Sequence, residues 1–110
     1  MAIQDWSDRI LLVELLAEPH FTEDLNALEE RVTEPIHDVV LNLSHIRSLN
    51  SSNLAHLLRV RKLLTRGDRQ LRLCGLHDSV WSVFLVTGLD KVFCFAEDVA
   101  SALASLQINR

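Results

Sequence analysis

The sequence is poor in the residues that mark several classes of protein. Among its 110 residues there is no Tyr, aromatic side chains make up 5%, and there are three Gly, two Pro and two Cys. Two cysteines are too few for a disulfide framework, and three glycines leave no glycine-rich phosphate loop. Cys74 and Cys94 each close an apolar, strand-like run, so both are predicted to be buried, reduced thiols. With so few aromatic side chains, the core must be built mainly from Leu, Val, Ile and Ala.

Long apolar runs are missing as well. No stretch approaches the roughly 18 apolar residues of a membrane-spanning helix. The opening residues MAIQDWSDR lack the basic start and apolar segment of a signal peptide. The sequence therefore predicts a cytoplasmic protein without a membrane span. A length of 110 residues predicts a single domain, residues 1–110, that forms one core without disulfides or a metal.

The residue patterns of common enzymes and metal sites are also absent. No G-x-S-x-G turn surrounds the paired serines Ser51 and Ser52. The histidines do not show the spacing of metal ligands; they are His20, His37, His45, His56 and His77. These absences predict a protein that is not an enzyme and that uses no metal or cofactor.

Charge is unevenly distributed along the chain. Residues 1–38 hold ten acidic and two basic side chains, whereas residues 39–110 hold five acidic and nine basic ones, within a net charge of −4. The basic residues cluster at Arg59, Arg61, Lys62, Arg66, Arg69 and Arg72. No aromatic residue is interleaved with them, and the whole chain is acidic. We therefore interpret the cluster as a solvated helix face and strand start, not as a nucleic-acid surface.

The order of apolar periodicities predicts an α/β fold. Strands are predicted near 10–16, 37–43, 70–74 and 92–95, and helices near 21–33, 51–66, 78–87 and 97–106. Strand and helix alternate four times with short connections, which favours a largely parallel sheet with crossover helices. The residues IQDW near the N-terminus are expected to add a short antiparallel edge strand.

Several residues are expected to mark helix ends. Thr22 and Asp78 are the expected N-caps, because their side-chain oxygens can accept a free backbone N–H of the first turn. Gly67 is expected to end the second helix at the position that tolerates positive φ, and Gly88 is expected to end the third.

The stretch SLNSSNLAHLL, residues 48–58, places two adjacent serines where a strand-like run passes into a helix. The side chain of either Asn50 or Ser51 is expected to cap that helix. A cap does not explain two neighbouring hydroxyls in an exposed loop, and a helix N-terminus is also where an added phosphate is best tolerated. The pair is therefore also a candidate site of modification.

From DVVLNLSHIRS onward the sequence resembles the STAS domain, the family of bacterial anti-sigma factor antagonists. In the family pattern, a strand leads into an Asp-Ser-Ser/Thr-Gly-Leu loop and a leucine- and arginine-rich helix that ends at a glycine. Here the loop reads NSSNL at 50–54, the glycine is Gly67, and VTGLDKVF at 86–93 matches a later signature. The resemblance covers about residues 10–106. It implies the STAS fold, a four- to five-stranded mostly parallel sheet with four crossover helices.

The resemblance implies a protein-binding switch. Members of the family dock on a GHKL-type serine kinase that is also an anti-sigma factor, and they thereby release the sigma factor. Phosphorylation of the serine that matches Ser51 ends the binding, with Ser52 as the second candidate here, and a cognate phosphatase restores it. The implied partner-binding loop consists of Asn50, Ser51, Ser52 and Asn53.

Departures from the family pattern leave an alternative open. Asn50 replaces the Asp before the serine, Asn53 replaces the Gly after the pair, and AEPHFTEDL stands in place of the usual Gly-Glu-Leu-Asp stretch. The family also includes modules without a working phosphosite. These serve as scaffolds in signalling complexes or as small accessory subunits of lipid ABC transporters.

The predicted helix at 78–87 carries a feature that the family pattern does not supply. Its stripe facing the sheet is predicted to consist of Val80, Val83, Phe84 and Thr87. Trp81 and Leu85 lie four residues apart and about 100° around the helix from this stripe. Either a neighbouring helix or the C-terminus covers them, or the pair forms a contact with a second copy or another partner.

Overall fold

The computed structural model describes residues 3–34 and 37–108, which form a sheet flanked by helices. The strands are β1 (Ile3–Asp5), β2 (Ile10–Glu14), β3 (Asp38–Asn42), β4 (Leu71–Cys74) and β5 (Phe95–Ala96). The helices are α1 (His20–Arg31), α2 (Ser51–Arg66), α3 (Asp78–Thr87), the short 3-10 helix η1 (Leu89–Lys91) and α4 (Val99–Ile108). None of these helices combines the length and apolarity needed to cross a membrane.

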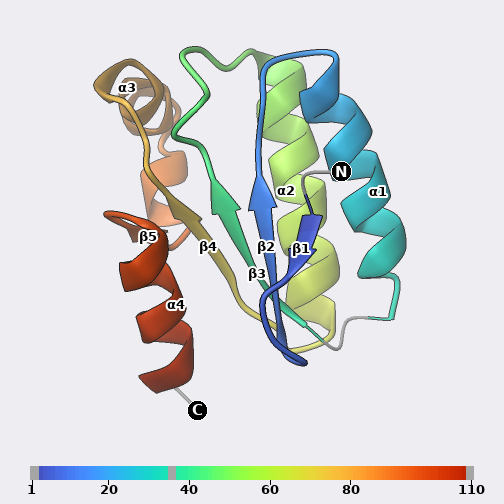
Figure 1. Cartoon of the computed structure of the whole chain (residues 1–110). Helices are drawn as coiled ribbons and strands as arrows, with labels where there is room; N and C mark the ends of the chain where they lie inside the picture. The colour runs from blue at the N-terminus through green and yellow to red at the C-terminus, as the bar shows by residue number, and fades with distance from the viewer. Residues whose placement is uncertain (1–2, 35–36, 109–110) are drawn as a thin grey trace.

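The strands lie in the sheet in their sequence order, β1-β2-β3-β4-β5. Strand β1 pairs antiparallel with β2, and every other pair is parallel. The mostly parallel α/β sheet and the short N-terminal edge strand are both confirmed. Because neighbouring parallel strands run the same way, the loops that follow β2, β3 and β4 meet at one edge of the sheet (Figure 1).

Helices cover both faces of the sheet, which explains the continuous apolar runs of its central strands. Leu11 and Val13 of β2 pack in the larger core with buried residues of α1, α2 and α3. Ile10 and Leu12, which alternate with them, pack on the opposite face in a smaller cluster with Leu103 and other residues of α4. Figure 1 shows α1 and α2 side by side behind the sheet and α4 in front of it.

The last predicted strand, 92–95, is displaced toward the C-terminus. Strand β5 is Phe95–Ala96, and its register pairs Leu73 with Phe95. The chain leaves α3 through η1, and Phe93 lies buried against the ring of Phe84 with ring centroids 5.7 Å apart. Val92 and Phe93 therefore precede the strand, and pairing with β4 begins with the bond from the Leu73 backbone N–H to the Cys94 carbonyl at 3.0 Å.

The expectation of two buried thiols is half wrong. Cys74, at the end of β4, is buried, and burial, with smaller effects of the Glu14 and Asp98 charges, raises the pKa of its thiol to about 11. Cys94 is exposed because it precedes the edge strand β5. Both cysteines are free.

Both of the predicted N-caps Thr22 and Asp78 are wrong. Helix α1 begins at His20 after Pro19, so Thr22 lies inside its first turn and is not the cap. His77, and not Asp78, is the N-cap residue of α3.

The glycines after the helices differ from each other. Gly67 follows α2 with a φ of −92°, and the positive φ of +58° falls on the next residue, Asp68. Aspartate is among the non-glycine residues that enter the left-handed region most readily. Gly88 ends α3 with a φ of +76°, as predicted.

The basic cluster is only partly the solvated surface that the sequence predicts. Arg59, Lys62 and Arg66 are exposed on α2. Arg72 on β4 is 8% exposed, so its interpretation as part of a solvated face is wrong. It lies at the start of a strand covered by α4, where its side chain bonds to Ser105 of that helix.

Candidate functional site

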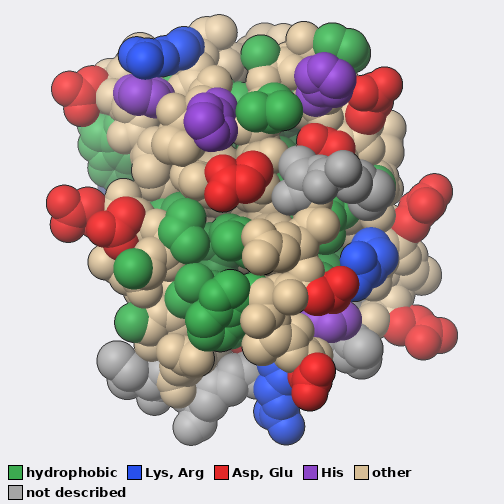
Figure 2. Space-filling model, viewed as in Figure 1, with side chains coloured by type: hydrophobic (Ala, Val, Ile, Leu, Met, Phe, Trp, Pro, Cys, Tyr) green, Lys and Arg blue, Asp and Glu red, His purple; other side chains and the backbone are tan. Residues whose placement is uncertain are grey.

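The paired serines lie at the sheet edge where the carboxyl ends of the parallel strands meet. Ser51 is the first residue of α2, which follows β3 through the loop 43–50. Both Ser51 and Ser52 are exposed. In open α/β sheets this edge is the usual place for binding sites. Figure 2 shows histidine, basic and acidic side chains gathered along the same edge, at the top of the view.

A reciprocal pair of hydrogen bonds fixes the start of α2. The Asn53 backbone N–H donates to Asn50 Oδ1 at 2.8 Å, and the Asn50 backbone N–H donates to Asn53 Oδ1 at 3.1 Å. This capping box satisfies backbone donors that a helix start leaves without partners. The cap is therefore Asn50, and the hydroxyl of Ser51 is not needed for it.

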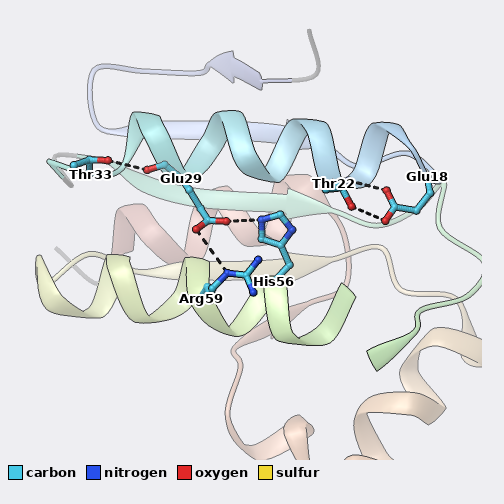
Figure 3. A network of polar contacts seen from close by, with 6 residues as sticks. All are labelled: Glu18, Thr22, Glu29, Thr33, His56 and Arg59. Atoms are coloured by element: carbon cyan, nitrogen blue, oxygen red, sulfur yellow. Dashed lines mark hydrogen bonds and ion pairs between the residues drawn. The ribbon is translucent and has the colours of Figure 1, made fainter. Parts of the chain in front are cut away.

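A carboxylate from the preceding loop is joined to this cap. The Asn53 side chain is only 6% exposed, and its Nδ2 donates to Glu18 Oε2 at 3.2 Å. Glu18 also accepts from the Thr22 hydroxyl at 2.6 Å and from the Thr22 backbone N–H at 2.8 Å (Figure 3). These bonds to Thr22, with a smaller one from Asn53, hold the pKa of the Glu18 carboxyl below its ordinary value. The serine loop, which we define as residues 43–53, thus has an ionised carboxylate beside it, although position 50 carries an amide.

The start of α3 holds the first half of the serine loop. The Ser79 hydroxyl donates to the Arg47 carbonyl at 2.9 Å. His77 Nε2 contacts the Ser44 carbonyl at 2.7 Å, and the Ser44 backbone N–H donates to Asn42 Oδ1 at 3.1 Å. Residues that follow β2 and β4 therefore both bond to the serine loop, which follows β3.

A hollow of about 430 Å³ lies between the loop after β2 and the serine loop. Phe21 and Ile46, which are buried in the core, line it together with Glu18 and Arg47. Its lining mixes apolar and polar side chains, and it includes the cap residues Asn50 and Asn53.

Comparison with known proteins identifies the family. The STAS domain model matches residues 14–102, which is most of the chain. This chain belongs to the STAS domain family.

Two solved structures of similar fold support the match. A crystal structure of a candidate anti-sigma factor antagonist from Thermotoga maritima has a TM-score of 0.81 at 15% identity, covering 92% of this chain and 90% of that chain. RsbS of Moorella thermoacetica, in a serine-to-glutamate variant, has a TM-score of 0.79 at 18% identity and covers 100% of both chains. At these identities the likeness establishes the shared fold.

A second polar network ties α1 to α2 in this STAS domain. His56, 4% exposed on α2, contacts the Glu29 carboxylate of α1 through Nε2, and Arg59 Nε lies 3.9 Å from the same carboxylate (Figure 3). No sequence pattern indicates this pairing, because the two residues are 27 positions apart. The contact fixes α2 one turn beyond the serines.

The two residues singled out on α3 have different surroundings. Trp81 is half-buried, and its ring packs edge-on against Phe95 with centroids 4.9 Å apart. Leu85 is 50% exposed, and its neighbour Val86 is 87% exposed. Val80 and Phe84 are buried against the sheet as predicted, whereas Thr87 is exposed and was wrongly assigned to that stripe.

No three His, Cys, Asp or Glu side chains come together as a possible metal site within residues 3–34 and 37–108. The loop predicted to bind a partner carries the amide and hydroxyl side chains of residues 50–53, and the Glu18 carboxylate bonds to it. Sequence reasoning identified its serines and asparagines but missed Glu18. Glu18 and Thr22 lie four residues apart with Pro19 between them, and this spacing is the one sequence feature that could have indicated a role for Glu18.

The serine loop also depends on a glycine at the end of β4, and this gives a test. Gly75 has a φ of +72°, and a Cβ added to it would lie 2.7 Å from Asn42 Oδ1. Gly75→Ala should lower the free energy of unfolding by about 2–4 kcal/mol, because left-handed strain adds to a steric clash. Urea denaturation measures the change.

Gly88→Ala is the matched control. Gly88 has a φ of +76° but no atom within 4 Å of the added Cβ. Only the left-handed strain remains there, so the cost should be about 1 kcal/mol. Equal losses in the two variants would show that the close approach of Gly75 to Asn42 has no energetic weight.

Proposed function

We propose that this STAS domain is a protein-binding switch of the anti-sigma factor antagonist type. Its serine loop binds a GHKL-type serine kinase that is also an anti-sigma factor, in the cytoplasm and without catalysing a reaction itself. Phosphorylation of Ser51 ends the binding, and a phosphatase restores it. The observation that carries the proposal is the exposed position of Ser51 at the first residue of α2, with the capping role filled by Asn50.

The physics of the site supports a modification that changes binding and leaves the fold intact. A phosphate adds about −1.5 to −2 charge at neutral pH. At the first turn of a helix, backbone N–H groups without helical partners and the positive end of the helix dipole stabilise such a charge. Beside the Glu18 carboxylate, it would turn the surface next to the loop strongly negative. A partner that fits the unmodified loop would then be repelled.

Glu18 supports the kinase reaction in one further respect. The family pattern places an Asp directly before the serine, and this chain has Asn50 there. Glu18 brings a carboxylate to the same loop through its bond with Asn53. We propose that this carboxylate, held ionised by its bonds to Thr22, meets the requirement for an acidic group near Ser51.

One observation favours the alternative of a scaffold or accessory subunit without a phosphosite. The family pattern has Gly where this chain has Asn53, and a glycine would let a partner approach the backbone closely. The Asn53 side chain fills that place and is bonded on both sides, to Asn50 and to Glu18. A loop closed in this way suits a permanent contact surface as well as a switch.

Substitution of the serines separates the two functions. The kinase recovered with this protein from the source cells should add one phosphate to the wild type and to Ser52→Ala, but none to Ser51→Ala. Ser51→Asp should bind the kinase at least about tenfold more weakly with nearly the wild-type melting temperature, because the added charge lies at the contact and outside the core. Phosphate incorporation and binding titrations measure both effects. Unchanged binding by Ser51→Asp would support the scaffold.

Self-association through α3 stays a prediction and has its own test. Leu85→Ser should weaken any self-association seen by sedimentation while changing the free energy of unfolding by less than about 0.5 kcal/mol, because the side chain is half exposed. Trp81→Ala should cost about 1–3 kcal/mol through the lost contact with Phe95. A wild-type protein that sediments as a monomer at all concentrations would exclude this contact.

A further inference from the structure

A second hollow lies at the opposite edge of the sheet, far from the serine loop. It is bounded by the last turns of α2, the start of β4 and residues 92–94. The serine loop follows the carboxyl end of β3, whereas this hollow lies beside the amino end of the parallel strand β4. We call it the arginine pocket, after its lining residues Arg61, Arg69 and Arg72.

The charge in the arginine pocket has one sign. No acidic residue lines it; the other polar side chains of its lining are Thr65 and Gln70. Within residues 3–34 and 37–108, no ion pair joins any of the three arginines to a carboxylate. The buried Asp38 carboxylate accepts from the Gln70 backbone N–H at 2.8 Å and does not line the pocket.

Carbonyl oxygens hold two of the guanidinium groups in place. Arg61 Nε donates to the Val92 carbonyl at 3.0 Å, and Arg69 Nε donates to the Gly67 carbonyl at 3.4 Å. Each bond uses one of the five donors of a guanidinium. Among the described residues no hydrogen bond uses the terminal nitrogens of Arg61 or Arg69. Two half-buried cations therefore keep paired N–H donors, which suit the oxygens of an anion.

The third guanidinium is buried, and its hydrogen bonds go to neutral groups. Arg72 donates to Gln70 Oε1 at 2.6 Å, to the Ser105 hydroxyl at 3.1 Å and to the Leu71 carbonyl at 3.3 Å. These bonds fix the Arg72 side chain beside the pocket, where an anion would place an opposite charge next to a buried one.

The size of the pocket limits the ligand. Its volume is about 170 Å³, below the roughly 300 Å³ at which pockets for drug-sized molecules begin. One tetrahedral oxyanion with five heavy atoms fits this space, whereas a whole nucleotide does not.

We propose that the arginine pocket binds a single phosphate group, held by Arg61 and Arg69 with Arg72 behind them. The nearby C-terminus of α2 contributes a partial charge of about −0.5, which three guanidinium groups outweigh. The phosphate is either the free ion or the end group of a larger molecule that extends into solvent. Its binding does not depend on Ser51 or on the function proposed for the serine loop.

Phosphate binding can be followed at the backbone amides of the whole chain. Sodium phosphate should produce saturable NMR shifts at Thr65, Arg69 and Cys94, and sodium chloride at equal ionic strength should not. AMP serves as a second probe with the same group on a larger molecule. Binding of AMP at least as tight as that of phosphate assigns the pocket to the end of a larger ligand, and weaker binding assigns it to the free ion.

Two double variants distinguish specific phosphate binding in the pocket from nonspecific attraction of phosphate to a basic surface. Arg61→Gln with Arg69→Gln should weaken phosphate binding at least about tenfold, because two charge-assisted contacts are lost. Lys62→Gln with Arg66→Gln removes the same charge from exposed residues outside the pocket and should leave binding unchanged. Where the first pair does not fold, Arg69→Gln alone should still weaken binding. Shifts that do not saturate, that chloride reproduces, or that both pairs reduce equally would overturn the proposal.

Discussion

The reciprocal hydrogen bonds between Asn50 and Asn53 fix the geometry of the serine loop where it enters α2. They set the first residue of α2 and leave the hydroxyl of Ser51 outside the cap. Because the buried Asn53 side chain also bonds to Glu18, the same pair joins the loop after β3 to the loop after β2. A substitution at Asn50, Asn53 or Glu18 would therefore alter the conformation of both loops and the surroundings of Ser51.

The parallel topology explains why these contacts can form at all. It brings the loops after β2, β3 and β4 to one edge, where α3 holds the serine loop through Ser79 and His77. Helix α2 begins at that edge and ends at the opposite one, beside the arginine pocket. The contact of His56 with Glu29 joins this helix to α1 one turn after its start. One helix thus connects the loop proposed to bind a protein partner with the pocket proposed to bind phosphate.

The order of strands and helices could be predicted from the sequence, because it follows from the pattern of apolar residues. Individual side-chain contacts could not be predicted in this way. The continuous apolar runs of β2 and β3 and the helical spacing of α2 follow from burial, so the order of elements and the antiparallel edge strand were correct. The last strand was predicted too close to the N-terminus, because Phe93 is buried as a strand residue would be but lies before β5. The bond of Thr22 to Glu18 and the burial of Arg72 depend on residues distant in sequence or on loop geometry, which periodicity does not encode.

The central claim is that Asn50 supports the structure and Ser51 does not, which leaves the serine available for modification. The free energies of unfolding of Asn50→Ala and Ser51→Ala, measured by urea denaturation in one buffer, test this most directly. The account predicts a loss of about 1 kcal/mol for Asn50→Ala, the usual cost of removing a cap. It predicts a change within about 0.5 kcal/mol for Ser51→Ala, as for other exposed side chains. A loss for Ser51→Ala as large as that for Asn50→Ala would contradict the account.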